Sequence, residues 1–301
     1  MKKYNFLLSV ILVLAIAFSA CTKADYGDNV VKGDPPPVPG GYINSSEVAA
    51  DNLLAYWNFD DTKAETKSNA TPLVDSNSSY IKGIKGDGLH LNKGYLLYPT
   101  IPALSSANAI SSVSVSLWMQ IANNGSTFSE LFTIARDTTK ENDWLSILNM
   151  GVETGQSVSN NFIDLHTWIG SYPSGTRKGG DNINDYGAVG VDYQRVPATS
   201  NWIHYVMRYD GPSENIDLFA NNIRVSNNNF RNRGGLGPLV MPTPTQVLFG
   251  AFSNNSAHFP LSGTQGFHGF LNGSIDEVRV YSKALTDVEI SALFKLERQG
   301  R

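Results

Sequence analysis

Apolar and polar residues alternate with a period of two in one short run after another along this chain. The clearest run is Ser-Val-Ser-Val-Ser-Leu-Trp-Met-Gln at 112–120, whose two valines, Leu117 and Met119 would lie on one face of a strand. Comparable runs, rich in β-branched and aromatic residues and separated by clusters of Gly, Asn and Ser, continue through residues 51–298. The pattern predicts many short antiparallel strands.

One helix is expected, at the C-terminal end. Glu289 follows Thr286 at the spacing of a capping box, and Ile290, Leu293 and Phe294 recur at helical intervals. The apolar stripe is narrow, so we expect this helix to pack on a sheet edge or at an end of the sheets. Because helices do not otherwise alternate with strands, the sequence predicts an all-β fold, an antiparallel two-sheet jelly-roll sandwich with a short C-terminal helix.

The first residues have the features of a secretory signal peptide. A basic start precedes an apolar run at 6–18, about 13 residues long, which is too short to span a bilayer comfortably. The run ends in Phe-Ser-Ala-Cys at 18–21, and small residues before a cysteine resemble the lipobox of bacterial lipoproteins. We predict a lipoprotein signal peptide at 1–20 and lipidation of Cys21. An ordinary signal peptide with a coincidental cysteine is the alternative.

Residues 21–50 have no apolar periodicity and contain a run of Pro and Gly at 33–41. Proline runs favour extended polyproline structure, so we predict a tether that holds one folded domain, 51–298, away from the membrane. Thr22 rather than Asp follows the cysteine, which favours the outer membrane over the inner one. We expect a lipid-anchored protein of the cell outer membrane, exposed at the surface or to the periplasm.

Composition excludes several classes of protein. The 301 residues include 23 Lys and Arg against 27 Asp and Glu, which gives a net charge of −4. The sequence has no basic stripe of the kind that nucleic-acid binding requires. Hydrophobic residues make up 41% of the chain, too many for a disordered protein. The single cysteine can form neither an intrachain disulfide nor a cysteine-built zinc site.

Three segments in order resemble a known family. They are Leu-Ala-Tyr-Trp-Asn-Phe-Asp-Asp at 54–61, Trp-Ile-His-Tyr-Val-Met-Arg-Tyr-Asp-Gly at 202–211 and Gly-Ser-Ile-Asp-Glu-Val-Arg-Val-Tyr-Ser-Lys-Ala-Leu-Thr at 273–286. Together they are similar to the laminin-G-like, or concanavalin-A-like, lectin-glucanase jelly roll. The resemblance implies two curved antiparallel sheets. It implies no single activity, because this fold carries lectins, adhesion modules, hydrolases and lyases.

The same resemblance implies one structural calcium ion. Related sandwiches often hold calcium where the first and last family strands meet, and Asp60, Asp61 and Asp276 match those positions. Calcium takes six to eight oxygen ligands from carboxylates, carbonyls and water. The alternative is that Asp276 pairs with a neighbouring arginine such as Arg279.

The sequence shows no complete catalytic set. Some concanavalin-A-like glucanases carry Glu-x-Asp-x-x-Glu on one strand, but the stretch 162–167 has only the central Asp164. Neither Gly-x-Ser-x-Gly nor His-Glu-x-x-His occurs, and the five histidines are scattered singly. Lyases on related sandwiches use Tyr, His and Arg, and these residue types occur here in loops, so a polysaccharide lyase stays an alternative.

Residues 142–195 mix aromatic side chains with Asn, Asp and Arg, the mixture that a sugar-binding site needs. Within them, 170–187 is predicted to be one long loop. The alternative for the strand tryptophans is a place in the core. The candidate glycan-binding residues are Trp144, His166, Trp168, Tyr172, Arg177, Tyr186 and Tyr193.

The sequence thus favours a membrane-anchored, lectin-like module without catalysis that captures polysaccharide or oligosaccharide for partners in nutrient uptake. Two alternatives stay open. One is a glycoside hydrolase or polysaccharide lyase on the same fold, and the other is a cell-surface adhesion module that binds protein.

Overall fold

The computed structural model describes residues 35–122, 124–153, 162–184, 196–197, 201–232 and 235–301. The chain divides into two units after Pro36, and the unit Pro37–Arg301 contains all the strands described below. Within the described residues, no helix is both long enough and apolar enough to cross a membrane. The predicted signal peptide and Cys21 lie outside the described residues.

The described elements are mostly strands. In chain order these are β1 (Leu53–Trp57), β2 (Val74–Lys82), β3 (Asp87–Leu97), β4 (Val113–Gln120), β5 (Ser129–Arg136), β6 (Leu148–Glu153), β7 (Phe162–Ser171), β8 (Lys178–Ile183), β9 (Val196–Pro197), β10 (Ile203–Asp210), β11 (Asn215–Ala220), β12 (Ile223–Arg224), β13 (Thr245–Phe249) and β14 (Leu271–Tyr281). The helical elements are the 3-10 turns η1 (Ser45–Glu47), η2 (Ala50–Asn52), η3 (Pro102–Leu104), η4 (Asn228–Phe230) and η5 (Asn255–Ala257), and the α-helix α2 (Asp287–Glu297).

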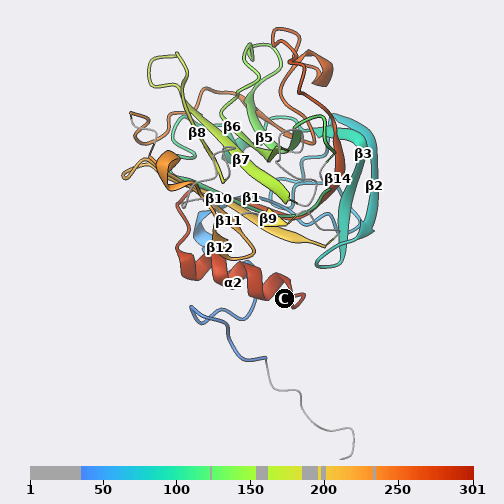
Figure 1. The fold of residues 1–301 in the computed structure, drawn as a ribbon, viewed down its shortest axis with the longest axis vertical. Helices are drawn as coiled ribbons and strands as arrows, with labels where there is room; N and C mark the ends of the chain where they lie inside the picture. Colours follow the sequence, from blue (N-terminus) through green and yellow to red (C-terminus); the bar gives the residue numbers. More distant parts are fainter. Residues whose placement is uncertain (1–34, 123, 154–161, 185–195, 198–200, 233–234) are drawn as a thin grey trace, which may run out of the picture. The chain divides into compact units, whose positions relative to one another are not determined.

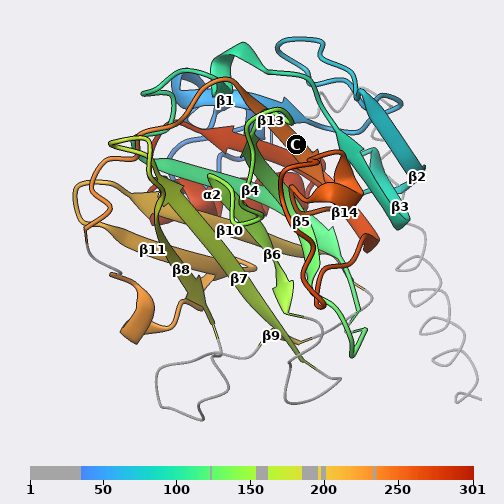
Figure 2. The same cartoon turned by 90° about the horizontal axis from the view of Figure 1, so that it is seen from above.

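The strands form one curled antiparallel sheet. Its main path runs β12-β11-β10-β4-β14-β3-β13-β5-β6-β7-β8, while β1 pairs with β14, β2 with β3 and β9 with β7. The path folds back on itself (Figures 1 and 2), so that β10, β4 and β14 form one layer and β5 to β8 the other. Across the interior, the hydroxyls of Thr167 in β7 and Tyr205 in β10 meet at 2.8 Å. The predicted all-β two-sheet sandwich is confirmed.

The interior between the layers holds one large apolar cluster. In β4, the alternate residues from Val113 to Met119 face this interior, as predicted. The opposite face of β4 is buried too, because α2 covers it and Phe294 stacks on Trp118 with ring centroids 5.7 Å apart. The helix therefore lies on the outer face of the layer (Figure 1), whereas the narrow stripe suggested an edge or an end.

Polar contacts hold α2 at both ends. The Thr286 hydroxyl accepts a hydrogen bond from the Glu289 amide at 3.2 Å, and the Thr286 amide donates to Glu289 Oε2 at 2.7 Å, which confirms the capping box. At the other end, the buried carboxylate of Glu297 contacts the guanidinium of Arg279 in β14. Arg279 also pairs with Glu277 at 2.7 Å. A buried positive charge thus lies between two carboxylates.

The last part of the predicted tether packs against the folded unit. Val48 is buried in an apolar cluster with Leu285 and Ile290, and Ser45 Oγ donates to the Arg301 carbonyl at 2.7 Å. The folded unit therefore begins at Pro37, earlier than the strand pattern indicated. The reason is that apolar side chains of this segment cover α2.

Candidate functional site

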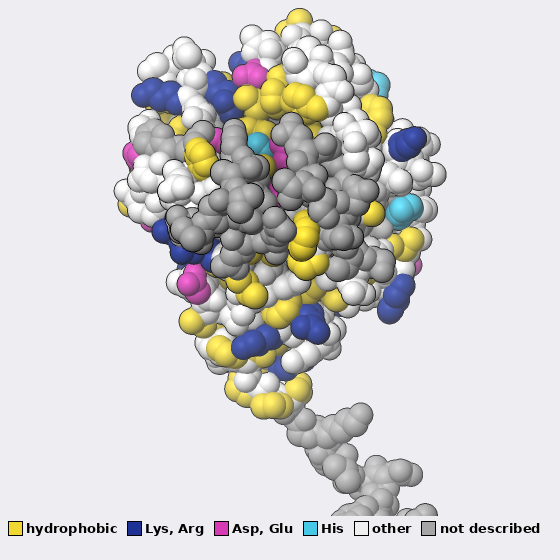
Figure 3. All heavy atoms as spheres, in the orientation of Figure 1, with side chains coloured by type: hydrophobic (Ala, Val, Ile, Leu, Met, Phe, Trp, Pro, Cys, Tyr) yellow, Lys and Arg dark blue, Asp and Glu magenta, His cyan; other side chains and the backbone are white. Residues whose placement is uncertain are grey.

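The outer face of β6, β7 and β8 carries the candidate site. Trp168 of β7 pairs with Asn149 of β6 and with Asp181 of β8, and cross-strand partners lie on one face of a sheet. His166 lies two residues before Trp168 and so shares that face. Figure 3 views the side on which Figure 1 draws β7 and β8, and hydrophobic, acidic and histidine side chains meet there beside the atoms drawn in grey.

His166 is held between two carboxylates. Its Nδ1 lies 2.8 Å from Glu153 Oε1 and its Nε2 lies 3.1 Å from Asp181 Oδ2. Burial by itself would lower the pKa of His166, but the hydrogen bonds to Asp181 and Glu153 outweigh it and raise the pKa above the ordinary 6.5. The imidazole ring also lies against Trp168, with ring centroids 3.6 Å apart. The histidine therefore orients both a carboxylate and an indole.

A hollow of about 260 Å³ opens beside Trp168. Arg177 lines it, donating from Nε to the Ser146 carbonyl at 3.0 Å and from Nη2 to the Ile169 carbonyl at 3.2 Å. A Cβ at Gly179 would come within 2.1 Å of Arg177 Nη1, so the guanidinium fits over this strand because the residue is glycine. Asp181 lines the same hollow. An aromatic ring, a guanidinium and a carboxylate thus converge on it.

Trp144 extends the aromatic surface toward the segment between β13 and β14. Its ring centroid lies 6.1 Å from Trp168, 5.3 Å from Phe267 and 5.4 Å from Phe252. Trp144 and Trp168 are both half-buried, which leaves part of each indole open to solvent. Such a surface can stack on the C–H faces of a sugar while Arg177 and Asp181 bond its hydroxyls.

The structure brings together four of the predicted glycan-binding residues, namely Trp144, His166, Trp168 and Arg177. Tyr172 is different, because it is only 6% exposed and belongs to the interior cluster, where its ring faces Arg136 at 5.4 Å. It offers no open ring to a ligand. The other two candidates, Tyr186 and Tyr193, lie outside the described residues.

The prediction of one long loop at 170–187 is wrong. Residues up to Ser171 belong to β7, and Lys178–Ile183 form β8, which pairs with β7 over His166 to Ser171. The sequence Lys-Gly-Gly-Asp-Asn-Ile has little apolar signal, so its strand character comes from the pairing. Sequence reasoning also missed Glu153 and Phe267, although alternation along β6 places Glu153 on the site face.

Two of the three predicted metal-binding aspartates, Asp60 and Asp276, contact the same turn. Asp276 Oδ2 accepts from the Ile84 amide at 2.8 Å, and Asp60 Oδ1 accepts from the Asp87 amide at 2.8 Å. A Cβ added to Gly83 would lie 2.4 Å from Asp276 Oδ2, and one added to Gly86 would lie 1.8 Å from Asp60 Oδ1. Both carboxyl groups therefore lie directly against the backbone of this turn.

Asp276 does not pair with Arg279, which instead contacts Glu277 and Glu297. Burial, with a smaller contribution from Glu277, raises the pKa of Asp276 to about 8. Asp61 is exposed. Among the residues that the structure describes, no three His, Cys, Asp or Glu side chains lie close enough together to hold a metal ion between them. Two carboxylates completed by backbone carbonyls and water would still suit calcium.

Comparison with known proteins bears on the fold. No family model matches the chain, and no curated protein is significantly similar in sequence. Among solved structures, domain 4 of AbnA, a GH43 extracellular arabinanase from Geobacillus stearothermophilus in complex with arabinotriose, is 18% identical. The match covers 80% of this chain and 98% of that domain, with a TM-score of 0.50.

Two botulinum neurotoxin domains are also similar. The serotype D ligand-binding domain, in complex with N-acetylneuraminic acid, is 12% identical over 83% of this chain, and the receptor-binding domain of mosaic serotype C/D is 14% identical over 82%. Both have a TM-score of 0.52, and this chain spans about half of each, 52% and 51%. At these identities the likeness shows a shared β-sandwich fold alone.

The position of His166 predicts a pH-dependent stability. Because its pKa is raised in the folded state, its contribution is fully present below about pH 6.5, the unfolded value, and is lost as the pH rises through the folded value. We expect His166→Asn to cost about 3 kcal/mol at pH 5.5, since charge-assisted hydrogen bonds are lost, and less at pH 9. Urea unfolding at a series of pH values measures this difference.

The exposed His258 provides the control, because Asn tolerates its positive φ of 70°. The stability difference between wild type and His258→Asn should stay constant over the same pH range. A His166→Asn difference that is equally constant would contradict a charged His166.

Proposed function

We propose that this protein is a non-catalytic glycan-binding module held at the outer membrane by lipid on Cys21. The observation that carries the proposal is the half-buried Trp168, which lies on an outer sheet face beside a hollow lined by Arg177 and Asp181. A sugar ring stacked on the indole would place its hydroxyls within reach of the guanidinium donors and the carboxylate acceptor. His166 holds Asp181 in position for this contact.

The charges of the site favour a neutral sugar. The imidazolium of His166 and the guanidinium of Arg177 balance the carboxylates of Glu153 and Asp181, so these four groups present no net charge to a ligand. Similarity to a domain in complex with arabinotriose, a neutral sugar, and to one in complex with N-acetylneuraminic acid, an anionic sugar, supports glycan binding in general; the preference for a neutral sugar rests on the charges of the site.

The strand β7 supports binding without hydrolysis. In the glucanase pattern, the two glutamates would stand on either side of Asp164, at positions that Phe162 and Thr167 occupy here. The Thr167 hydroxyl points into the interior, toward Tyr205. Asp181, a carboxylate that lines the hollow, is engaged with His166, as is Glu153 on the other side of the imidazole.

We expect the full-length chain to bind neutral oligosaccharides on a glycan array, and Trp168→Ala to weaken binding at least about tenfold. Truncating an aromatic anchor at the centre of an interface typically costs about 2 kcal/mol or more. Calorimetry with an array hit measures the loss. Tyr80→Ala, which removes a 40% exposed ring from β2, is the matched control and should bind like wild type.

Each array hit should also be incubated with the protein and assayed for new reducing ends and for unsaturated products. Binding without products supports a lectin-like module. Product formation would replace it with a hydrolase or a lyase, and the absence of any glycan ligand would overturn glycan binding altogether.

The membrane anchor rests on the sequence. Cys21 follows an apolar signal-like run, and more than one acyl chain gives stable anchoring where a single chain is marginal. A surface or periplasmic position would let the module pass captured glycan to uptake partners.

We expect the protein made in a Gram-negative host to partition into the detergent phase of a Triton X-114 extract, and Cys21→Ala to move it to the aqueous phase. Thr22→Ala keeps the cysteine and should partition like wild type. Equal partitioning of Cys21→Ala and wild type would rule out a lipid anchor at this residue.

We also propose that Asp60 and Asp276, with carbonyls of the turn between Gly83 and Asp87, hold one structural calcium ion. Both carboxylates already contact this turn from chain segments far apart in sequence, so an ion there would tie β1, β3 and β14 together. Asp61 is the nearest further carboxylate along the chain.

Calcium should therefore raise the melting temperature of the EDTA-treated protein. At a hundred times its Kd, one site adds about 2.7 kcal/mol to the free energy of unfolding. Thermal unfolding with calcium, with magnesium and with EDTA measures the effect. Asp276→Asn should abolish it, whereas Asp51→Asn, at an exposed position, should preserve it. Identical melting with calcium and with EDTA would refute the site.

A further inference from the structure

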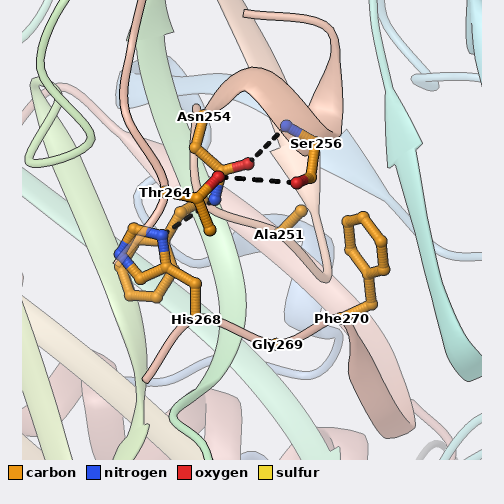
Figure 4. A pocket seen from close by; sticks show the side chains of 8 residues that line it. Ala251, Asn254, Ser256, Thr264, His268, Gly269 and Phe270 are labelled. Atoms are coloured by element: carbon orange, nitrogen blue, oxygen red, sulfur yellow. Dashed lines mark hydrogen bonds between the residues drawn. The ribbon is translucent and has the colours of Figure 1, made fainter. Parts of the chain in front are cut away.

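A second, smaller hollow of about 110 Å³ lies in the segment that connects β13 to β14. In Figure 4, His268 and Phe270 stand on opposite sides of it, with Ala251 and Gly269 between them and Ser256 at its edge. Phe252 stacks on His268 with ring centroids 4.3 Å apart and adds to the same wall. The hollow therefore has apolar walls.

Its polar groups are neutral and held in place. Asn254 donates from Nδ2 to His268 Nδ1 at 2.9 Å and accepts from the Ser256 amide at 3.0 Å (Figure 4). Burial lowers the pKa of His268 to about 4, so the ring is uncharged at neutral pH. The hydroxyls of Ser256 and Thr264 lie 3.4 Å apart at the rim. The Thr264 hydroxyl donates to Asn255 Oδ1, which leaves its oxygen to accept from a ligand, while the Ser256 hydroxyl can donate or accept. Among the described residues, none that lines the hollow has a charged side chain.

These walls match one kind of sugar substituent. An ammonium or a carboxylate would enter without a partner charge, which is costly in a half-closed hollow. A sugar hydroxyl in the hollow would place a polar group against the faces of the aromatic rings and against Ala251, which offer it no hydrogen bond. An acetamido group has a methyl for the apolar walls and an amide for the hydroxyls of Ser256 and Thr264, and the volume suffices for a group of this size.

A chain of packed rings connects this hollow to the Trp168 surface. The His268 ring lies 5.0 Å from Trp144, and Trp144 lies 6.1 Å from Trp168, so the sum of the two distances, about 11 Å, is the most that can separate the Trp168 and His268 rings. A short oligosaccharide can therefore reach both places. Phe267, which is 36% exposed, contacts both Trp144 and His268 and bridges the two places.

We propose that this hollow is a subsite for an N-acetyl group, and that the protein prefers oligosaccharides containing 2-acetamido sugars over those with a free hydroxyl or amine at the same carbon. The inference rests on the proposed glycan binding at Trp168 and adds the class of sugar.

Three β-1,4-linked trisaccharides that differ only at carbon 2 provide the test, namely those of N-acetylglucosamine, glucose and glucosamine. Calorimetry on the full-length chain should show the acetylated trisaccharide binding about tenfold or more tightly than the glucose one, because filling an apolar pocket with one methyl is worth at least this factor. Equal or tighter binding of the glucose or glucosamine trisaccharide would overturn the subsite and leave glycan binding intact. Failure of every trisaccharide and of every array glycan would overturn both.

Ser256→Leu should place a bulky side chain at the mouth of the hollow and remove the acetyl preference without loss of glucose-trisaccharide binding. Thr264→Val, nearly isosteric, should reduce the preference by deleting one hydroxyl. Both residues are exposed, so neither change disturbs the interior. Ser79→Leu, at an exposed position of β2, is the matched control and should keep the full preference. An unchanged preference in both hollow variants would place the acetyl group elsewhere.

Discussion

A charge removed from water has to be paired within the protein, and this constraint shapes both outer faces of the sandwich. On the β10–β4–β14 layer, Arg279 lies between Glu277 and Glu297, which ties the last strand to the last helix. On the β6–β8 layer, His166 lies between Glu153 and Asp181. The Arg279 pairs hold α2 against the outer face of its layer and so cover that face. The His166 pairs rigidly orient polar groups while part of an indole stays open to solvent, which is the arrangement a binding surface needs.

Glycines give these polar groups their space. Gly179 lets the Arg177 guanidinium lie across β8, while Gly83 and Gly86 let a turn approach the carboxylates of Asp276 and Asp60. In each case a single added Cβ would clash with an ionisable group, the guanidinium or one of the carboxyl groups. In both the proposed glycan site and the proposed calcium site, the absence of a side chain thus brings the backbone close to an ionisable group. Their positions are nevertheless independent, because one lies on a sheet face and the other at the turn before β3.

Sequence patterns succeeded where the signal was local. Alternation predicted β4 and its interior face, and the Thr286–Glu289 spacing predicted the start of α2. They failed where strand pairing, or burial by distant parts of the chain, decided the local structure. Residues 178–183 became a strand through pairing with β7, and Tyr172 was buried because its surroundings belong to the interior cluster. The aromatic segment between β13 and β14 had no marked pattern, yet it supplies Phe252, Phe267 and His268 to the surface around Trp144.

The sequence by itself determined the class of fold, the helix boundary and which regions hold aromatic and polar residues together, because periodicity and capping act over a few neighbouring positions. Only the tertiary structure decided which of those residues meet. Glu153, His166 and Asp181 come from three different strands, and their convergence depends on the register of β6 and β8 against β7. Register is a long-range property of the curled sheet. For that reason the sequence pointed to a candidate glycan-binding region, while the pairing of strands brought Trp168 and Asp181 together beside Arg177 within it.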